Sequence, residues 1–404
     1  MKQFRKILNL WGRLFFVLFI LILTFSFAMF QGGFVSWFIF YMALPFVLYS
    51  LFLSFYPLKD IQLTREIHTK QIRKGNNFAA SVTLNRSIPF PLLYTILEEK
   101  THSPALKKRN ASENRKMFMP GFRKSYSWNY EIESMPRGEH VLEGIQVEIA
   151  DFFGWVKKTR MVPLQQTVLV YPNTVDIAYR AMESRYDQGS MAAPFTLVKD
   201  TTMATGIRDY QPGDRVSWIH WKSFARTQTM RTKEFEDRQS EDLYLLDDRR
   251  LSDKFEVQVD LVASILQSIV RANSSVAYLS IGHSRDHFPI LQTEEHLQRV
   301  MYFLTKVQPD LDKPAEEAVS RDLLQMNATS LLYVTSRLTI EMVETIQRKA
   351  KHLNSCMCLI VMNKGEKPTD EDEMAHQFAR SRGFIVKMVG PENFATVFTE
   401  VSRK

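Results

Sequence analysis

The sequence predicts a membrane-anchored, multi-domain protein with a two-helix transmembrane hairpin, an antiparallel β-sandwich and an α/β domain. Three observations predict it. No charged residue lies between Arg13 and Lys59. Short alternating apolar segments then continue to about Pro172, and from Asp242 apolar strands alternate with amphipathic helices. The expected boundaries are 1–58 for the hairpin, 59–172 for the β-sandwich, 173–241 for a connecting region and 242–404 for the α/β domain.

Two apolar segments, Leu14–Phe30 and Phe34–Tyr56, form the predicted hairpin. A helix needs about 20 apolar residues to cross a bilayer core, which the second segment reaches and the first reaches if residues 7–11 extend it. Gln31-Gly32-Gly33 separates the two segments, and the glycine pair favours a tight turn. The apolar run is too long for a signal-peptide core, so an uncleaved anchor is expected.

Basic residues flank the hairpin on both sides, and the connecting turn has none. The chain is therefore expected to cross the cell membrane twice. The positive-inside rule predicts that both termini lie in the cytoplasm. No ionisable residue lies inside either segment, so a transport path through the hairpin is not expected. The flanking residues are Lys2, Arg5, Lys6 and Arg13 before it, and Lys59, Arg65, Lys70, Arg73 and Lys74 after it.

The composition indicates a globular protein in a reducing compartment. Charged residues make up 24% of the chain, and the only cysteines, Cys356 and Cys358, are too few for a disulfide framework. Two small buried residues on one strand are the favoured interpretation of this pair. The formal net charge is +8, which suits an anionic membrane surface. No long Lys/Arg tail is present, so a nucleic-acid partner is not expected.

Short strands separated by turn residues predict the β-sandwich. Gly75-Asn76-Asn77, Pro120-Gly121 and Phe153-Gly154 are such turns. The strands are expected near residues 61–67, 78–84, 126–132, 141–149 and 168–171.

The last part of the chain alternates strand and helix, which predicts a mostly parallel sheet covered on both faces. Ligands of such sheets bind at the carboxyl ends of the strands, where Asp247 and Asp248 follow the first strand. We expect them to belong to an exposed charged surface that docks a partner. The expected strands are 243–246, 276–281, 330–334, 356–362 and 384–389, and the expected helices are 255–272, 294–305, 340–349, 371–381 and 392–401.

The connecting region contains the most unusual stretch, Gly206–Arg226, in which arginine and aspartate alternate. Pro212-Gly213 is a turn pair that would present the next two residues. Two interpretations stay open. The guanidiniums could bind an anion or a partner, or they could pair with the aspartates and lock the turn between two domains. The candidate residues are Gly206, Arg208, Tyr210, Pro212, Gly213, Asp214, Arg215, Trp221, Lys222 and Arg226, together with Asp247 and Asp248.

The histidines do not form a convincing catalytic or metal-binding set. His220 lies in the motif, but no nucleophile or paired carboxylate stands at a suggestive spacing. His283 and His287 are four residues apart in a loop-like run that matches no metal spacing.

The motif resembles a bacterial family known as domain of unknown function 58. The residues that carry the resemblance are Gly206, Arg208, Tyr210, Pro212–Arg215, Ile219, Trp221, Ala225-Arg226 and Lys233-Glu234, with Arg137-Gly138, Asp151–Gly154 and Val170–Pro172 in support. The resemblance implies that residues 242–404 form a von Willebrand factor A-like domain. Such domains often hold Mg²⁺ after the first strand, but Asp247-Asp248 is followed here by Arg249-Arg250, and Thr335-Ser336-Arg337 stands on a later loop. A hard cation needs an oxygen shell, so no metal and no cofactor are expected.

The resemblance also implies a scaffold or adaptor at the membrane that partners a MoxR-type AAA+ ATPase and a transglutaminase-like membrane protein. No enzymatic activity is expected. The alternative is a hydrolase that acts on an anionic substrate at the motif, and it would need an open pocket lined by His220, Asp214 and Lys222. Nucleic-acid binding would need a continuous basic face.

Overall fold

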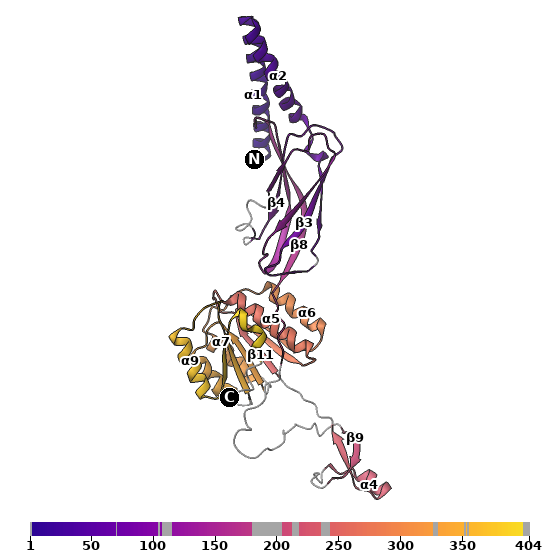
Figure 1. The fold of residues 1–404 in the computed structure, drawn as a ribbon, viewed down its shortest axis with the longest axis vertical. Helices are drawn as coiled ribbons and strands as arrows, with labels where there is room; N and C mark the ends of the chain where they lie inside the picture. The colour runs from indigo at the N-terminus through magenta and orange to yellow at the C-terminus, as the bar shows by residue number, and fades with distance from the viewer. Residues whose placement is uncertain are drawn as a thin grey trace. The chain divides into compact units, whose positions relative to one another are not determined.

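The structure is a computed structural model of the 404-residue chain (Figure 1). It describes residues 2–69, 71–103, 106, 115–179, 204–211, 218–235, 243–325, 330–350, 353 and 355–398. The chain divides into two compact units. Unit 1 is Met1–Asn173 with Tyr302–Val307, and unit 2 is Thr174–Met301 with Gln308–Lys404. The predicted four-part division stays a prediction.

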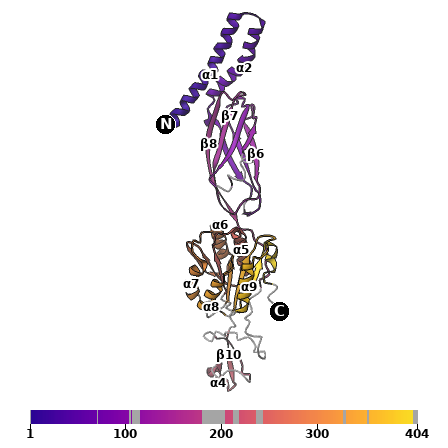
Figure 2. The same ribbon diagram turned by 90° about the vertical axis from the view of Figure 1, so that its left-hand side faces the viewer.

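Unit 1 begins with two helices, α1 (Lys2–Gln31) and α2 (Phe34–Phe55), that run side by side (Figures 1 and 2). Gly32 and Gly33 make the turn with φ values of +52° and +126°, which an L side chain rarely adopts. By length and composition α2 can cross a membrane, while the apolar part of α1, Phe15–Gln31, is shorter.

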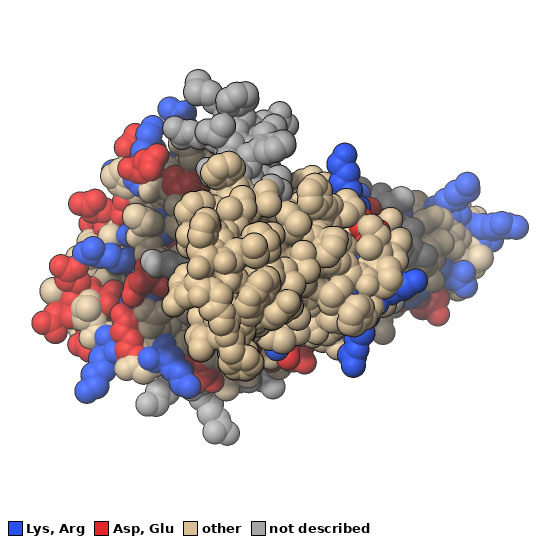
Figure 3. Space-filling model, turned by 90° about the horizontal axis from the view of Figure 1, so that it is seen from above, with Lys and Arg blue, Asp and Glu red and all other residues tan. Residues whose placement is uncertain are grey.

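Apolar side chains make up most of the exposed surface of Phe15–Gln31 in α1 and of α2. Figure 3 shows a broad surface on which no Lys, Arg, Asp or Glu appears. A surface helix of a water-soluble domain carries only one apolar stripe, so helices that are apolar all round suit a lipid environment. Exposed members are Phe15, Phe19, Ile22, Leu23 and Phe30 on α1, and Phe34, Val35, Phe38, Met42 and Phe55 on α2.

The rest of unit 1 contains two β sheets. One has the order β1-β3-β6, and the other the order β2-β8-β7-β4-β5. All pairings are antiparallel except that of β2 with β8, which is a two-residue parallel pairing that the predicted antiparallel architecture did not include. The strands are β1 (Gln62–Ile67), β2 (Ile72–Arg73), β3 (Phe78–Asn85), β4 (Tyr94–Thr101), β5 (Arg115–Phe118), β6 (Ser125–Ile132), β7 (Gly138–Ala150) and β8 (Lys157–Tyr171).

Alternating burial along the strands gives both sheets one shared core. In β4 every second residue is buried, as the period of an extended strand requires. Buried residues of both sheets form a single cluster, which also includes Val47 and Leu53 of α2. The predicted strands of this part of the chain therefore exist, and the end of α2 packs against them.

A buried ion pair crosses this core. Arg65 of β1 donates from Nη2 to Oε1 of Glu99 on β4 at 2.5 Å, and both side chains are almost fully buried. Tyr130 of β6 donates to the other carboxylate oxygen, and Arg65 also donates to the Leu164 carbonyl of β8. Arg65 is therefore not one of the surface charges that could orient the hairpin.

Polar contacts fasten the last turns of α2 to the loops of the sheets. Ser50 donates to Oδ2 of Asp151, which lies in the turn between β7 and β8, at 2.5 Å. Tyr49 donates to the Pro91 carbonyl at 2.9 Å, and Lys158 donates to the Ser54 carbonyl at 3.0 Å. The short 3-10 helix η1 (Leu58–Asp60) connects α2 to β1.

Unit 2 contains a six-stranded sheet of order β13-β12-β11-β14-β15-β16, with helices on both sides (Figure 2). Only the edge strand β13 is antiparallel to its neighbour. This is the doubly wound order, in which the first strand is central and ligands bind beyond the carboxyl ends of the strands. The strands are β11 (Leu243–Asp248), β12 (Val276–Ile281), β13 (Arg285–Leu291), β14 (Ser330–Thr335), β15 (Ser355–Val361) and β16 (Ile385–Val389).

Three helices cover one face of this sheet. Buried residues of α7, α8 and α9 share a core cluster with one face of the strands, whereas α5 belongs to no part of that cluster and contacts β12 and β14. The helices are α5 (Phe255–Arg271), α6 (Glu294–Lys306), α7 (Ala315–Gln325), α8 (Ile340–Lys349), α9 (Asp370–Ser381) and the 3-10 helix η4 (Pro391–Thr396).

Three expectations for this unit were wrong or incomplete. The run from His283 to His287 is not a loop, because β13 begins at Arg285 and pairs with β12. An edge strand that is mostly exposed lacks a clear apolar alternation, so its sequence resembles a loop. Helix α7 was not predicted, and the expected helix at 392–401 is a 3-10 helix over Pro391–Thr396.

We expect Arg65→Met to destabilise unit 1 by about 3–5 kcal/mol, because it leaves Glu99 buried without its cation. Burial already raises the pKa of Glu99, against the opposing effect of Arg65. Without Arg65 the pKa rises further, so the loss should be largest at pH 8 and shrink as the pH falls toward 4 and Glu99 takes up a proton. Urea unfolding of the detergent-solubilised chain, followed by tryptophan fluorescence, measures this.

Arg65→Met/Glu99→Gln is the matched control, since a neutral amide can still accept from Tyr130. It should recover most of the stability and lose the pH dependence. Equal stability of Arg65→Met at pH 4 and pH 8 would contradict the expectation.

Candidate functional site

The motif folds as a small element of its own, made of β9 (Ala204–Asp209), β10 (Arg231–Phe235) and the one-turn to two-turn helix α4 (Trp221–Thr227). Strands β9 and β10 pair antiparallel, with Thr232 opposite Arg208. We call these three segments the motif element. The sequence predicted only an irregular connection here, because two short, half-exposed strands give no clear alternation.

The interleaved charges of the motif are only partly described. Asp209 forms an ion pair with Arg231 at 3.4 Å, and Arg208 donates to the Asp209 carbonyl at 3.1 Å. The partner of Asp209 is thus an arginine outside the predicted motif. Pro212, Gly213, Asp214 and Arg215 lie outside the described residues, so the choice between a lock and a binding surface stays open for that turn.

His220 has a structural task in the motif element. Its Nδ1 accepts a hydrogen bond from the Ser223 backbone at 3.0 Å, which caps the first turn of α4. Trp221 is 57% exposed and stands edge-on to Phe224. Lys222 and Arg226 are exposed on the same helix. The element therefore presents an aromatic ring and two cations to the outside.

Asp247 and Asp248 end the central strand β11 and are both buried. The expectation that they form part of an exposed surface was therefore wrong. Strand β11 lies between β12 and β14, and its last residues are covered as fully as its apolar ones. Burial raises the pKa of Asp247 to about 7, and the neighbouring hydroxyl groups of Tyr278 and Ser280 oppose that rise. Burial also raises the pKa of Asp248.

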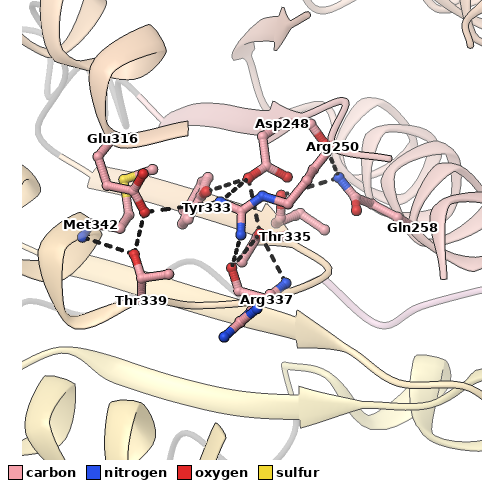
Figure 4. A network of polar contacts seen from close by, with 10 residues as sticks. Asp248, Arg250, Gln258, Glu316, Tyr333, Thr335, Arg337, Thr339 and Met342 are labelled. Carbon is pink, nitrogen blue, oxygen red and sulfur yellow. Dashed lines mark hydrogen bonds and ion pairs between the residues drawn. The ribbon is translucent and has the colours of Figure 1, made fainter. Parts of the chain in front are cut away.

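A network of polar side chains surrounds Asp248 (Figure 4). Tyr333 and Thr335 of β14 both donate to Oδ2 of Asp248, at 2.7 and 3.0 Å. Gln258 of α5 donates to the Asp248 carbonyl at 2.6 Å. The Arg250 guanidinium lies 3.6 Å from the same carboxylate oxygen.

Arg250 links this carboxylate to the start of α7. Its Nη2 lies 4.0 Å from Oε1 of Glu316, and its Nη1 donates to the Arg337 carbonyl at 3.5 Å. Thr339 caps α8 by accepting from the Met342 backbone and donates to Glu316. The guanidinium therefore supplies positive charge beside the buried Asp248 carboxylate.

Arg249 is held on the opposite side by the β12–β13 hairpin. Its guanidinium contacts Asp286 at 3.0 Å and Asp310 at 3.0 Å, and donates to the Ser284 carbonyl at 2.6 Å. A Cβ at Gly282 would overlap both the Arg249 guanidinium and the Asp310 carboxylate. Only glycine leaves room for this pair.

The charged residues at the end of β11 form ion pairs with one another, but they provide few ligands for a metal ion. In the described part of the chain, no group of three or more His, Cys, Asp or Glu side chains is placed to hold an ion. Oδ2 of Asp248 already accepts two hydroxyl donors, and the guanidiniums of Arg249 and Arg250 flank the end of β11. These residues do not fit a hard cation, which needs six or more oxygen ligands. The expectation of no metal rests on this donor set.

The other titratable candidates are separated from one another. His283 lies 3.7 Å from Asp312, whereas His287 stacks on Tyr244. Cys356 and Cys358 are free thiols on β15, and they lie on the face that packs against α7 to α9. Burial raises the pKa of the Cys356 thiol.

The described residues of unit 2 line at least two cavities. One of about 710 Å³ lies beside the carboxyl end of β12 and the start of α7, lined by Gly282, Arg285, Lys313, Arg321 and Arg348 among others. The other, of about 490 Å³, lies along the edge strand β16. Neither includes His220 or Lys222, which the hydrolase alternative would place in a pocket.

Comparisons with known proteins agree with the motif. Residues 206–361 match the family described as protein of unknown function DUF58. The uncharacterized protein YeaD of Bacillus subtilis (strain 168) is 36% identical over 324 residues, which cover 79% of this chain and 81% of that protein. The chain belongs to the DUF58 family. The predicted resemblance is thereby confirmed.

Solved structures resemble the DUF58 chain only weakly. A von Willebrand factor type A protein from Catenulispora acidiphila is 12% identical, with a TM-score of 0.29, and the match covers 42% of this chain and 43% of that one. An aerotolerance-related membrane protein from Bacteroides fragilis NCTC 9343 is 11% identical, with a TM-score of 0.28. This match covers 40% of this chain and 98% of that one. The doubly wound strand order, rather than either likeness, supports the α/β fold.

Sequence analysis missed several residues of the buried network in this DUF58 chain. Thr335 was noted on a later loop, whereas Tyr333 was missed, although residues two apart on a strand point to the same face. Glu316 carried no signal, since its helix was not predicted. Gln258 was hidden within an otherwise apolar helix face.

We expect the stability of the six-stranded sheet to fall as the pH rises through about 7. The pKa of Asp247 is raised when folded, so its protonated form stabilises the fold, and this contribution is lost above the folded pKa. Since each pKa unit is worth about 1.4 kcal/mol, roughly 3 kcal/mol of this contribution is lost between pH 5 and pH 8. Hydrogen exchange of β11 at pH 5 and pH 8, corrected for intrinsic rates, measures it. Asp247→Asn should remove the difference, and an unchanged difference in that variant would refute the assignment.

We expect Gly282→Ala to destabilise unit 2 by about 1–3 kcal/mol, because the added methyl group displaces the Arg249–Asp310 pair. In an Arg249→Ala/Asp310→Ala background the same change should cost much less. Thermal unfolding of the four proteins gives the coupling free energy. Additive effects would show that the steric explanation is wrong.

Proposed function

We propose that this DUF58 protein is a membrane-tethered scaffold or adaptor whose motif element binds a protein partner. The observation that carries the proposal is the exposed surface of that element. Trp221, Ile207 and Met230 are large apolar side chains in contact with solvent, and Lys222 and Arg226 lie on the same helix as Trp221. Tryptophan and arginine are the residue types that dominate binding energy at protein interfaces.

The size of the motif element supports the same conclusion. A two-stranded sheet is marginally stable by itself in water, and three or more strands or a packed helix are usually needed. Helix α4 has seven residues, none of them buried. An element that buries so little gains stability when a partner covers it.

We further propose that α1 and α2 cross the membrane as a hairpin with both termini in the cytoplasm, and that the two sheets of unit 1 act as a β-sandwich above it. The apolar surfaces of both helices support the crossing, and the shared core of the two sheets supports the sandwich. This orientation would expose unit 2 to cytoplasmic proteins.

The partner that we propose is a MoxR-type AAA+ ATPase, in the assembly or maturation of a membrane or cell-envelope complex that includes a transglutaminase-like membrane protein. The family resemblance supports this choice. The two exposed cations of α4 favour an acidic surface on the partner.

The hydrolase alternative gains no support from the described residues. His220 uses Nδ1 to accept a backbone hydrogen bond, as a helix cap does. The buried carboxylate of Asp248, at the end of the central strand β11, accepts from a tyrosine hydroxyl and lies beside a guanidinium of the protein itself.

We expect Trp221→Ala to weaken binding of the purified ATPase about thirtyfold, since truncation of an interface hot spot costs about 2 kcal/mol. Lys222→Glu/Arg226→Glu should weaken it further at low salt. The full-length chain in nanodiscs and the ATPase from the same cell, titrated by surface plasmon resonance, provide the measurement.

Matched controls come from unit 2. Met374 is as exposed as Trp221, and Lys364 is an exposed lysine. Met374→Ser and Lys364→Glu should bind like the unmodified chain. Equal affinity of Trp221→Ala and Met374→Ser would contradict a docking role for the motif element.

A further inference from the structure

Three loops lie together at the end of unit 1 where α2 is attached. They are residues 86–93 between β3 and β4, 119–124 between β5 and β6, and 151–156 between β7 and β8. The strand register brings them together, since Leu92 bridges to Gly121 and Tyr94 pairs with Ala150. We call residues 86–93, 119–124 and 151–156 the loop rim.

One buried and one partly exposed charged side chain hold the loop rim together. Arg86 is 5% exposed and donates to three backbone carbonyls, those of Arg123 at 2.8 Å, Phe90 at 2.5 Å and Gly121 at 2.6 Å. Asp60 accepts from the backbone of Ile88 at 3.0 Å. The loop rim is therefore held in a defined conformation, because the buried Arg86 guanidinium donates to backbone carbonyls of two of its loops.

The outward side of the loop rim is apolar. Its five large hydrophobic side chains are strongly exposed: Ile88 40%, Met119 63%, Phe122 69%, Phe152 55% and Phe153 51%. A water-soluble surface rarely gathers so many. The only acidic residue in the three loops is Asp151, which is buried. Arg123 and Lys124 follow Phe122 and are exposed.

Aromatic contacts make this surface continuous with the two helices. The Phe46 ring of α2 lies 5.3 Å from Phe153 and 5.9 Å from Phe152. Trp155 stacks on Phe153 at 4.5 Å and meets Phe16 of α1 edge-on at 6.4 Å. The lipid-facing surface proposed for the hairpin thus continues directly onto the loop rim.

The length of α2 sets the depth of this contact. Phe46 lies about 18 Å along the helix axis from Phe34, at a rise of 1.5 Å per residue. A hydrocarbon core of about 30 Å would end near Leu53 if it began at Phe34. The helix therefore meets Phe152 and Phe153 before it has left the membrane.

We propose that the loop rim inserts into the headgroup–acyl boundary of the membrane that holds the hairpin. Phe122, Phe152 and Phe153 would lie at the level where aromatic side chains anchor membrane proteins, and Arg123 and Lys124 would contact anionic lipid headgroups. The inference rests on the proposed membrane crossing. It goes further, because it makes the sheets of unit 1 a membrane-contacting domain with a defined orientation.

Site-directed fluorescence tests the proposal on the full chain. Phe122→Cys, Met119→Cys and Phe152→Cys place a bimane label on the loop rim. Phe38→Cys places it on α2, and Glu133→Cys at the other end of the sheets. The unsubstituted chain, labelled in parallel, measures the background from Cys356 and Cys358. Nanodiscs of phosphatidylcholine and phosphatidylglycerol are compared with nanodiscs whose lipids carry brominated acyl chains.

The loop-rim labels and the Phe38 label should each lose about half of their fluorescence in brominated lipid, while the Glu133 label keeps it, as burial at the acyl boundary requires. Quenching at Phe38 without quenching at any loop-rim position would overturn the inference and leave the membrane crossing intact. Loop-rim labels that neither brominated lipid nor aqueous iodide quenches would indicate a covering protein, which also overturns it. Absence of quenching at Phe38 would refute the crossing itself.

Discussion

The fold of unit 2 depends on how it accommodates the carboxylates that its central strand buries. Asp247 and Asp248 end β11, between two other strands, and neither reaches solvent. An ionised carboxylate in such a place costs several kcal/mol unless it is paired. Tyr333 and Thr335 donate to Oδ2 of Asp248 and Arg250 lies beside the same oxygen, while the raised pKa of Asp247 allows that group to be neutral. The protein's own groups therefore occupy the end of β11, while a cavity opens beside it at the end of β12.

This arrangement bears on function. The doubly wound order places the usual ligand site at this end of the sheet. Here a guanidinium lies between Asp248 and Glu316, and a second one is clamped beside Gly282. Both guanidiniums pair with carboxylates of the protein itself, and these ion pairs stabilise the fold. Apart from the two cavities of unit 2, the described residues expose the motif element and the apolar loop rim, which suit a protein partner and a membrane.

The sequence indicated most of the elements but not the interior charges. Periodicity identified the five parallel strands of unit 2 and the long helices, because a buried strand or helix face is apolar over many residues. It failed for β9, β10 and β13, which are short or exposed and bury too little to leave a pattern. Asp247 and Asp248 were recognised as candidates, yet their burial was not, since a charged pair in a sequence usually indicates the surface.

The sequence alone determined that an apolar helix pair precedes a β-rich part and an α/β part, and its motif determined the family. Each of these follows from local composition, spacing or matching residues. Only the tertiary structure decided which charges lie inside. Arg65, Arg86, Asp151 and Arg250 look like ordinary charged residues of loops and strand ends. Several of their partners lie far along the chain, such as Ser50, which is 101 residues from Asp151. Pairing at that distance depends on strand order and register, which no local pattern encodes.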